Sequence, residues 1–232
     1  VPSIINPFDM YAIEEALRLK EAHGGTVTVL SMGPPQVESA LREAVSLGAD
    51  KAVLLSDRAF AGADTWATST TLAAGIRALG GCDLIICGKQ AIDGDTAQVG
   101  PGVAELLDIP QVTFVKKVVS VESGAITVQR MVEEGYEVIR TSLPAMLTVV
   151  KEINDPRLPS LKGKMRAKKE IIMVLKADAL DLQGEKVGLD GSPTRVVKVF
   201  TPPRKTSGEV WQGEADELAK KLADFLKKRR AG

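Results

Sequence analysis

Hydrophobic residues in the first half of the chain recur in two alternating patterns. Helical spacing predicts helices over residues 6–23, 37–47 and 64–79, and apolar runs between them predict strands over residues 26–30, 52–55 and 84–87. Strands that are apolar throughout are typical of a mainly parallel sheet with helices over both faces. We therefore expect an α/β fold whose strand-to-helix loops meet at one edge of the sheet, where ligands bind in such folds.

The first predicted helix has a recognisable start. Asn6 is expected at the N-cap, Pro7 suits the first helical position, and Asp9 can return a hydrogen bond to the cap. The pair Gly24-Gly25 is expected to end this helix.

The pattern changes after Pro110. Residues 112–119, 125–131 and 136–140 are β-rich and are separated by short turns that contain glycine, which predicts an antiparallel meander. Residues 144–150 are then expected to return to the core.

Beyond Asn154 the chain no longer follows the pattern of a compact domain. Residues 155–161 are extended and punctuated by proline, residues 162–169 are basic, and an amphipathic helix is predicted over about 214–228. We expect an α/β domain over residues 1–153, a loop with a basic run over 154–170, and a C-terminal arm with its helix over 171–232. Composition leaves two interpretations of the arm open: a segment that lies on another subunit, or a loop with a capping helix.

Composition narrows the classes of function. The 232 residues hold 30 Lys and Arg against 30 Asp and Glu, with 4% aromatic residues, which argues against nucleic-acid binding. No apolar run approaches the ~20 residues that span a bilayer. His23 is the only histidine, so we expect neither a Ser-His-Asp triad nor a metal site, and no catalytic residue in this chain. Cys82 and Cys87 are expected to be unpaired thiols in a reducing, cytoplasmic compartment.

The segment after the third predicted strand is rich in glycine. Residues 88–102 hold four glycines and lead into a predicted helix over 103–107. Glycine lets a backbone approach a ligand, and the free N–H groups of a helix start attract phosphate. The segment is neither a Walker loop nor a Rossmann fingerprint, so its pattern leaves open both nucleotide binding and a tight loop without a ligand.

Two carboxylates lie within this segment. Asp95 and Gln98 resemble a capping box, which would start a helix near Thr96. Because carboxylates repel phosphate, we expect Asp93 and Asp95 to cap backbone groups or to bind ribose hydroxyls.

Five motifs follow one another in the order found in the beta subunits of electron-transfer flavoproteins. They are Asn6-Pro7-Phe8-Asp9, Ala12-Ile13-Glu14-Glu15-Ala16, Gly48-Ala49-Asp50, Gly88-Lys89-Gln90-Ala91-Ile92-Asp93 and Lys164-Met165-Arg166-Ala167-Lys168-Lys169. The chain resembles that family over essentially its whole length. The resemblance implies a Rossmann-like, adenine-nucleotide-binding domain that forms a heterodimer with an FAD-carrying alpha subunit.

The resemblance also implies a second nucleotide, held by this chain. The residues that match the family's nucleotide contacts are Asn6, Pro7, Phe8, Asp9, Met32, Ala91, Ile92, Asp93, Gly94, Asp95, Thr96, Ala97, Gln98, Val99, Gly100, Pro101 and Gly102. Family members usually open with a strand that also lines this nucleotide. Since this chain begins Val1-Pro2-Ser3, we expect that strand upstream of it.

Two branches of the family differ in that nucleotide. The chain is similar to the electron-bifurcating branch in its Val1-Pro2 leader, in residues 93–101, and in carrying Gly94 where AMP-binding chains commonly have an acidic residue. The resemblance implies FAD as cofactor, NADH as electron donor, and ferredoxin or flavodoxin as low-potential acceptor. A housekeeping subunit with structural AMP, and a colourless adenine-nucleotide sensor, are the alternatives.

Residues 155–161 match the family's partner-recognition loop. The resemblance implies that Leu161 anchors in a pocket of an acyl-CoA dehydrogenase-type flavoprotein. One buried apolar anchor is a recognised way to hold a transient complex. Without the resemblance, a core leucine beneath a loop would be the simpler interpretation.

Overall fold

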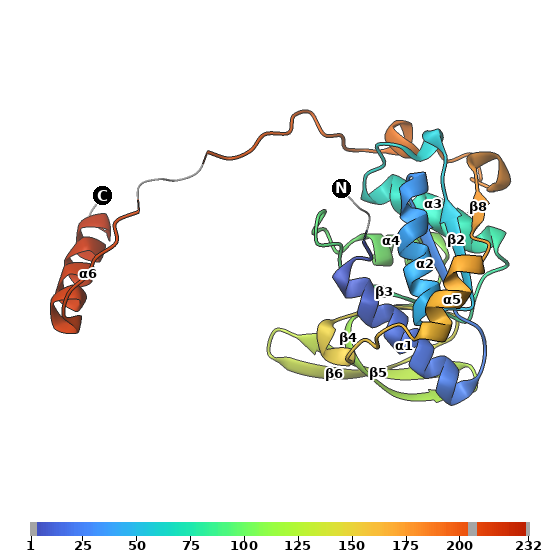
Figure 1. The fold of residues 1–232 in the computed structure, drawn as a ribbon, viewed down its shortest axis with the longest axis horizontal. Helices are drawn as coiled ribbons and strands as arrows, with labels where there is room; N and C mark the ends of the chain where they lie inside the picture. The colour runs from blue at the N-terminus through green and yellow to red at the C-terminus, as the bar shows by residue number, and fades with distance from the viewer. Residues whose placement is uncertain (1–3, 204–207, 231–232) are drawn as a thin grey trace. The chain divides into compact units, whose positions relative to one another are not determined.

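The computed structural model describes residues 4–203 and 208–230, which fall into two compact units, Val1–Arg195 and Val196–Gly232 (Figure 1). The strands of the described residues all lie in the first unit. The Val1-Pro2 leader lies outside the described residues.

One sheet of the first unit is parallel. It contains β1 (Thr28–Met32), β2 (Lys51–Leu55) and β8 (Met173–Leu175), in the order β1-β2-β8. The sequence predicts β1 and β2 from their apolar runs. It does not predict β8, because this strand has only 3 residues and joins the sheet through pairing with β2, which is distant in the chain.

The other sheet is mixed. It contains β3 (Leu84–Gly88), β4 (Gln111–Glu122), β5 (Ala125–Val132), β6 (Gly135–Ser142) and β7 (Ala145–Val149), in the order β3-β7-β4-β5-β6. The predicted meander is confirmed, since β5 is antiparallel to both β4 and β6. The return to the core is confirmed by β7, which is parallel to β3 and β4.

The helices of the first unit are α1 (Pro7–His23), α2 (Glu38–Leu47), α3 (Thr65–Ala78), α4 (Val99–Leu106) and α5 (Leu161–Lys169). Alternate residues of β2 explain why that strand is apolar throughout. Ala52 and Leu54 pack in a cluster with α2 and α5, whereas Val53 and Leu55 pack with α3 on the opposite face. The α/β fold expected from the sequence is confirmed, with its parallel strands divided between two sheets.

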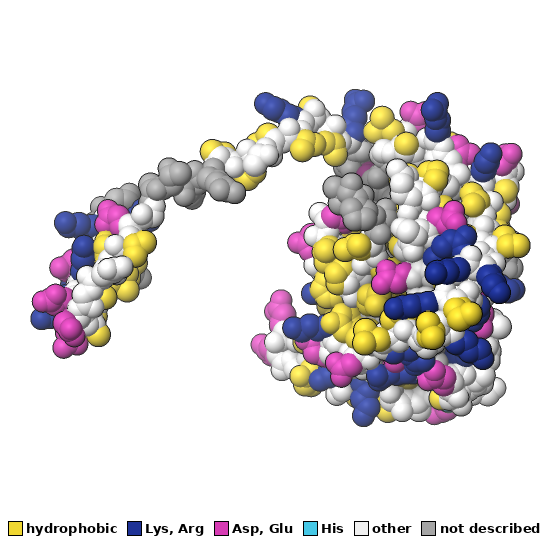
Figure 2. Space-filling view, in the orientation of Figure 1, with side chains coloured by type: hydrophobic (Ala, Val, Ile, Leu, Met, Phe, Trp, Pro, Cys, Tyr) yellow, Lys and Arg dark blue, Asp and Glu magenta, His cyan; other side chains and the backbone are white. Residues whose placement is uncertain are grey.

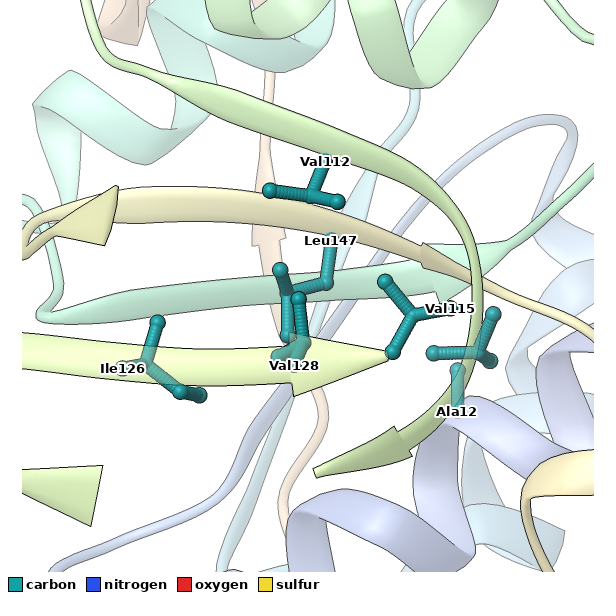
Figure 3. Close-up of a cluster of buried hydrophobic side chains, with 7 residues drawn as sticks. Ala12, Val112, Val115, Ile126, Val128 and Leu147 are labelled. Atoms are coloured by element: carbon teal, nitrogen blue, oxygen red, sulfur yellow. The ribbon is translucent and has the colours of Figure 1, made fainter. Parts of the chain in front are cut away.

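Helix α1 packs on two neighbours. Ala12 joins the buried cluster of the mixed sheet, where Figure 3 shows it beside Val115. Ile13 and Leu17 pack instead against Ala44 and Leu47 of α2. Other sides of α1 contact the loop after β3 and residues 154–157.

The second unit contains α6 (Ala215–Arg230), close to the helix predicted over 214–228. The indole of Trp211 lies edge-on to Phe225, with 5.5 Å between ring centroids, and the Lys221 ammonium lies 4.6 Å from the Trp211 ring. Leu222 and Leu226 are exposed on the helix.

Candidate nucleotide site

The start of α1 is tied to the loop that follows β3. Asn6 occupies the N-cap position, but its side chain forms no capping hydrogen bond within the described residues. Its amide instead donates to the carbonyl oxygen of Gln90 at 2.9 Å, and its Oδ1 accepts from the Ile92 N–H at 3.2 Å. The predicted N-cap position of Asn6 is confirmed, but its side chain holds a distant loop and does not cap the helix. Pro7 occupies the first turn of the helix, as predicted.

Asp9 fastens the end of β3 to the same turn. Its Oδ1 accepts from the Gly88 N–H at 2.7 Å, and its Oδ2 accepts from the Asn6 amide at 3.0 Å. A Cβ at Gly88 would lie 2.5 Å from the Cβ of Phe8 and 2.9 Å from the Asp9 nitrogen. Only glycine lets α1 approach the strand this closely, which gives the Gly-Lys-Gln signature a physical reason.

Cys87 precedes Gly88 in β3. Burial, with the nearby Asp9 carboxylate, raises the pKa of the Cys87 thiol above its ordinary value. The thiol is therefore protonated at neutral pH and packs as a small apolar side chain.

The loop from residue 91 to residue 98 turns sharply before α4. Asp95 and Ala97 adopt left-handed conformations, with φ of 53° and 55°. Helix α4 therefore begins at Val99, and the predicted box of Asp95 and Gln98 with a helix start near Thr96 is wrong, as is a start at 103. Left-handed residues cannot belong to a right-handed helix, so the start shifts to the first residue after them.

The carboxylates of this loop bind within it. Asp93 accepts from the Gly94 N–H at 2.7 Å, and Asp95 accepts from the side-chain amide of Gln90. Gly94 itself has no conformational or packing need to be glycine, since its φ is not positive and no atom of the described chain lies within 4 Å of a Cβ placed there. Its missing side chain leaves open space outside the loop.

Two further glycines bring α4 close to its neighbours. A Cβ at Gly100 would lie 2.8 Å from the Thr148 methyl and 2.9 Å from the Cys87 sulfur, and a Cβ at Gly102 would lie 2.6 Å from Ser69 Oγ. The N–H groups of Val99 and Gly100 lie in the first turn, where the helix offers them no carbonyl partner. They form the positive end of the helix dipole, which favours an anion.

A hollow of about 270 Å³ joins this helix start to the start of α3. It is lined by Thr65, Trp66, Ser69, Ala97, Gln98, Pro101 and Gly102. The motifs of the sequence do not predict the three α3 residues, Thr65, Trp66 and Ser69. A sequence feature that could have identified these residues is the aromatic Trp66 just after a helix N-cap, Asp64. The Trp66 side chain is 44% exposed.

Met32 lies apart from these contacts. It ends β1 opposite Leu55 of β2 and packs with the cluster around Phe60. The structure therefore brings together Asn6, Asp9 and the loop after β3, and it joins the start of α4 to α3. Met32 does not line the hollow between these helices and packs with a cluster that includes Ala74 of α3.

Leu161 is the first residue of α5 and is 77% exposed, which excludes a core leucine. The extended segment predicted through residue 161 ends one residue earlier, because Ser160 Oγ accepts from the Gly163 N–H and caps the helix. Leu158, which the sequence analysis does not single out, is 89% exposed. Figure 2 shows Lys and Arg side chains gathered over α5, which the basic run forms.

Across the described ranges 4–203 and 208–230, no cluster of three His, Cys, Asp or Glu side chains is arranged to hold a metal ion. In the same ranges, no helix combines the length and apolar character needed to cross a membrane.

Comparisons with known proteins agree with one another. Residues 1–180 match the family model described as the electron transfer flavoprotein domain. The chain is 52% identical over 230 residues to the electron transfer flavoprotein subunit beta of Thermoanaerobacterium thermosaccharolyticum, with 99% of this chain and 88% of the relative covered. It is 49% identical over 231 residues to subunit CarD of the caffeyl-CoA reductase-Etf complex of Acetobacterium woodii, covering 99% and 88%. Protein FixA of Azotobacter vinelandii is 48% identical over 231 residues, covering 97% and 82%.

Proposed function

Since the chain belongs to the electron transfer flavoprotein family, as a beta subunit, we propose that it binds FAD and works in electron bifurcation. As a beta subunit it pairs with an electron transfer flavoprotein alpha subunit. In the proposed reaction NADH donates electrons, which divide between an acyl-CoA dehydrogenase-type flavoprotein and ferredoxin or flavodoxin. The bound flavin would supply the redox chemistry, and this chain binds and orients it.

The residues around α4 fit the diphosphate and adenosine part of such a cofactor. The N–H groups of Val99 and Gly100 offer donors to phosphate at the positive end of the helix. Asn6 and Asp9 bind the backbone of residues 88–92 and so position the loop that would contact the cofactor with them. Trp66 supplies an exposed aromatic face at the rim of the hollow.

Gly94 is the observation that favours FAD over AMP. Neither the backbone conformation nor the packing of this chain requires glycine there, and the absent side chain leaves space beside the loop for a larger cofactor. A flavin extends beyond the AMP moiety and needs free space near the loop, and an acidic side chain at this position would occupy that space and add negative charge beside phosphate. The Acetobacterium woodii relative, named as part of a caffeyl-CoA reductase complex, supports a reductase partner of the same class.

Counting the nucleotides tests this proposal. The heterodimer is purified, extracted with acid, and its nucleotides are separated by chromatography. We expect two FAD per heterodimer. One FAD and one AMP would assign the chain to the housekeeping branch, and a heterodimer without flavin would leave a nucleotide sensor.

We propose that Leu161 anchors this subunit to the acyl-CoA dehydrogenase-type flavoprotein that receives the electrons. Its exposure makes it available as an apolar anchor, and the basic α5 beside it suits an acidic partner surface. Residues 154–170 thus serve as the recognition region. We propose that the C-terminal arm binds the alpha subunit. Residues 171–195 pack in the first unit, so the segment that lies on the alpha subunit would begin at Val196. The exposed Leu222 and Leu226 of α6 would be its apolar contacts.

A further inference from the structure

The guanidinium of Arg157 binds two carboxylates of α1. Its Nε lies 2.8 Å from Glu14 Oε2, and its Nη1 lies 2.5 Å from Glu21 Oε1. The backbone N–H of Arg157 also donates to Glu14 Oε2, at 3.1 Å. The Glu14 side chain is only 5% exposed, so its charge is compensated almost entirely by these donors and by Arg18, whose Nε lies 2.8 Å away.

Further contacts tie the preceding residues to the same helix. The Asn154 amide donates to the Tyr11 carbonyl and to Glu15 Oε2, both at 3.0 Å. Arg18 also donates to the Asp155 carbonyl at 3.4 Å. The contacts on α1 come from positions 11, 14, 15, 18 and 21, which follow one another along one side of the helix.

The residues on the far side of the exposed leucines are fixed as well. A Cβ at Gly163 would lie 2.1 Å from the Ser46 carbonyl oxygen, so α5 lies directly against the end of α2. The Arg42 guanidinium donates to the Ala167 carbonyl at 2.6 Å. Leu158 and Leu161 therefore project from a short stretch of chain that is held at both ends.

The way in which the stretch is held is unusual for a surface loop. Between Asp155 and Ser160 no side chain is buried, so this part of the chain contributes nothing to the hydrophobic core. Polar contacts to α1 hold it instead, and Arg157 makes more of them than any other residue of the stretch. Loss of the guanidinium would release the stretch without opening a cavity.

We infer that Arg157 is a positioning residue for docking: by binding Glu14 and Glu21 it sets Leu158 and Leu161 in the arrangement that the partner flavoprotein receives. The inference rests on the proposed docking role of Leu161. Fixing the backbone in advance lowers the ordering cost of binding, so its loss weakens the complex without removing a contact. Helix α1 also holds the loop after β3 through Asn6 and Asp9, which places the nucleotide loop and the docking segment on one rigid element.

A double-mutant cycle in the complete heterodimer tests this inference. Arg157→Gln, Leu161→Ala and the double variant are assayed for electron delivery to caffeyl-CoA reductase, the reductase named with the Acetobacterium woodii relative. We expect Arg157→Gln to raise the KM for the reductase about tenfold, with unchanged kcat at saturation and unchanged flavin content. The melting temperature should fall, because the buried Glu14 carboxylate loses a charged partner. In the Leu161→Ala background it should raise the KM by much less than tenfold, because one of the two leucines that Arg157 positions has already been removed.

The cycle separates the two proposals. If Leu161→Ala raises the KM and Arg157→Gln does not, the positioning inference is wrong and the docking proposal stands. If the two effects multiply, Arg157 acts independently of Leu161, which also overturns the inference. If neither variant changes the KM, the docking proposal itself fails.

Two further variants test whether a folding defect, and not the lost contact, explains the change in KM. Glu21 is 59% exposed, so Glu21→Gln removes only the outer half of the contact and should raise the KM in the same direction by a smaller factor. Arg157→Lys keeps the charge but cannot bind both carboxylates as a planar fork, so its KM should fall between those of the wild type and Arg157→Gln.

A measurement without the partner completes the test. Thermolysin cleaves before leucine, and native cleavage before Leu161 should accelerate about tenfold in Arg157→Gln if the stretch is released. Equal cleavage rates in the two proteins would overturn the inference.

Discussion

Asp64 accepts two hydrogen bonds from Thr194, from its backbone N–H at 2.9 Å and from its hydroxyl at 2.8 Å. The other carboxylate oxygen of Asp64 caps α3 by accepting from the N–H groups of Trp66 and Ala67, at 3.0 and 3.1 Å. One side chain thus starts a helix that lines the nucleotide hollow and fixes the chain just before the second unit begins at Val196.

Replacing Asp64 with Ala should destabilise the first unit by about 1–2 kcal/mol, because the helix loses its cap and Thr194 loses its acceptor. Thermal unfolding of the heterodimer measures the effect. Asp64→Asn is the matched control, since asparagine is also a good N-cap, and it should lose less than half as much. Equal losses in both variants would show that the charge, rather than the hydrogen bonds, stabilises this site.

Replacing Gly88 with Ala should lower stability by about 3 kcal/mol and reduce the nucleotide content of the beta subunit. The added Cβ would lie 2.5 Å from Phe8 and would push the first turn of α1 away from β3. Chemical denaturation and nucleotide extraction measure the two effects. Gly94→Ala is the control, because its Cβ would meet no atom of the described residues within 4 Å, and its stability should equal that of the wild type.

Replacing Gly94 with Asp should remove the beta-subunit flavin while the stability of the protein without nucleotide stays unchanged. The open space beside Gly94 can accept a side chain, so only the cofactor should suffer from the added charge. The alpha-subunit flavin should remain, because another subunit holds it. A Gly94→Asp heterodimer with full flavin content and full NADH oxidation would refute the assignment of this loop.

Replacing Leu161 with Ala should weaken the complex with the partner flavoprotein by about thirtyfold, which corresponds to the loss of roughly 2 kcal/mol at a binding hot spot. The melting temperature should not change, because the side chain is 77% exposed in the subunit. Titration of the heterodimer with the partner measures the affinity. Leu158→Ala, at the other exposed leucine, reports whether the anchor is one side chain or two.

Acid should release the docking stretch through Glu14. Burial raises the pKa of Glu14. Hydrogen bonds from Arg157 and Arg18 lower it by more than burial raises it, so the pKa lies below the ordinary value of 4.5. A carboxyl group whose pKa is lower in the folded state stabilises that state above its ordinary pKa, and this contribution is lost as the pH falls through the lower value. Pepsin, which acts in acid and cleaves beside leucine, should cut at Leu161 increasingly fast below about pH 4.

Two variants isolate that titration from other carboxylates. In Glu14→Gln the group cannot ionise, so cleavage of the stretch should already be fast at the upper end of the range and should change less with pH. Arg157→Gln should behave in the same way, because Glu14 and Glu21, whose pKa values Arg157 lowers, then have no guanidinium to release when they take up protons. An unchanged pH dependence in Glu14→Gln would assign the effect to a different group.

The helices α1, α2 and α3, the strands β1 to β3 and the meander follow from hydrophobic spacing, because each forms where a local pattern and its stop signals agree. The family motifs likewise identify Asn6, Asp9 and the loop after β3 as one region, and the structure connects them by hydrogen bonds.

Tertiary contacts decide the remainder. β8 exists because it pairs with β2, Gly88 is required because Phe8 lies against it, and Asn6 leaves its cap to bind Gln90. α4 begins at Val99 only because the loop before it adopts left-handed conformations. The exposure of Leu158 and Leu161 depends on contacts between residues 154–157 and a helix more than a hundred positions earlier. Local propensity carries no information about partners so distant in the chain, because the energy that selects them appears only when the elements pack.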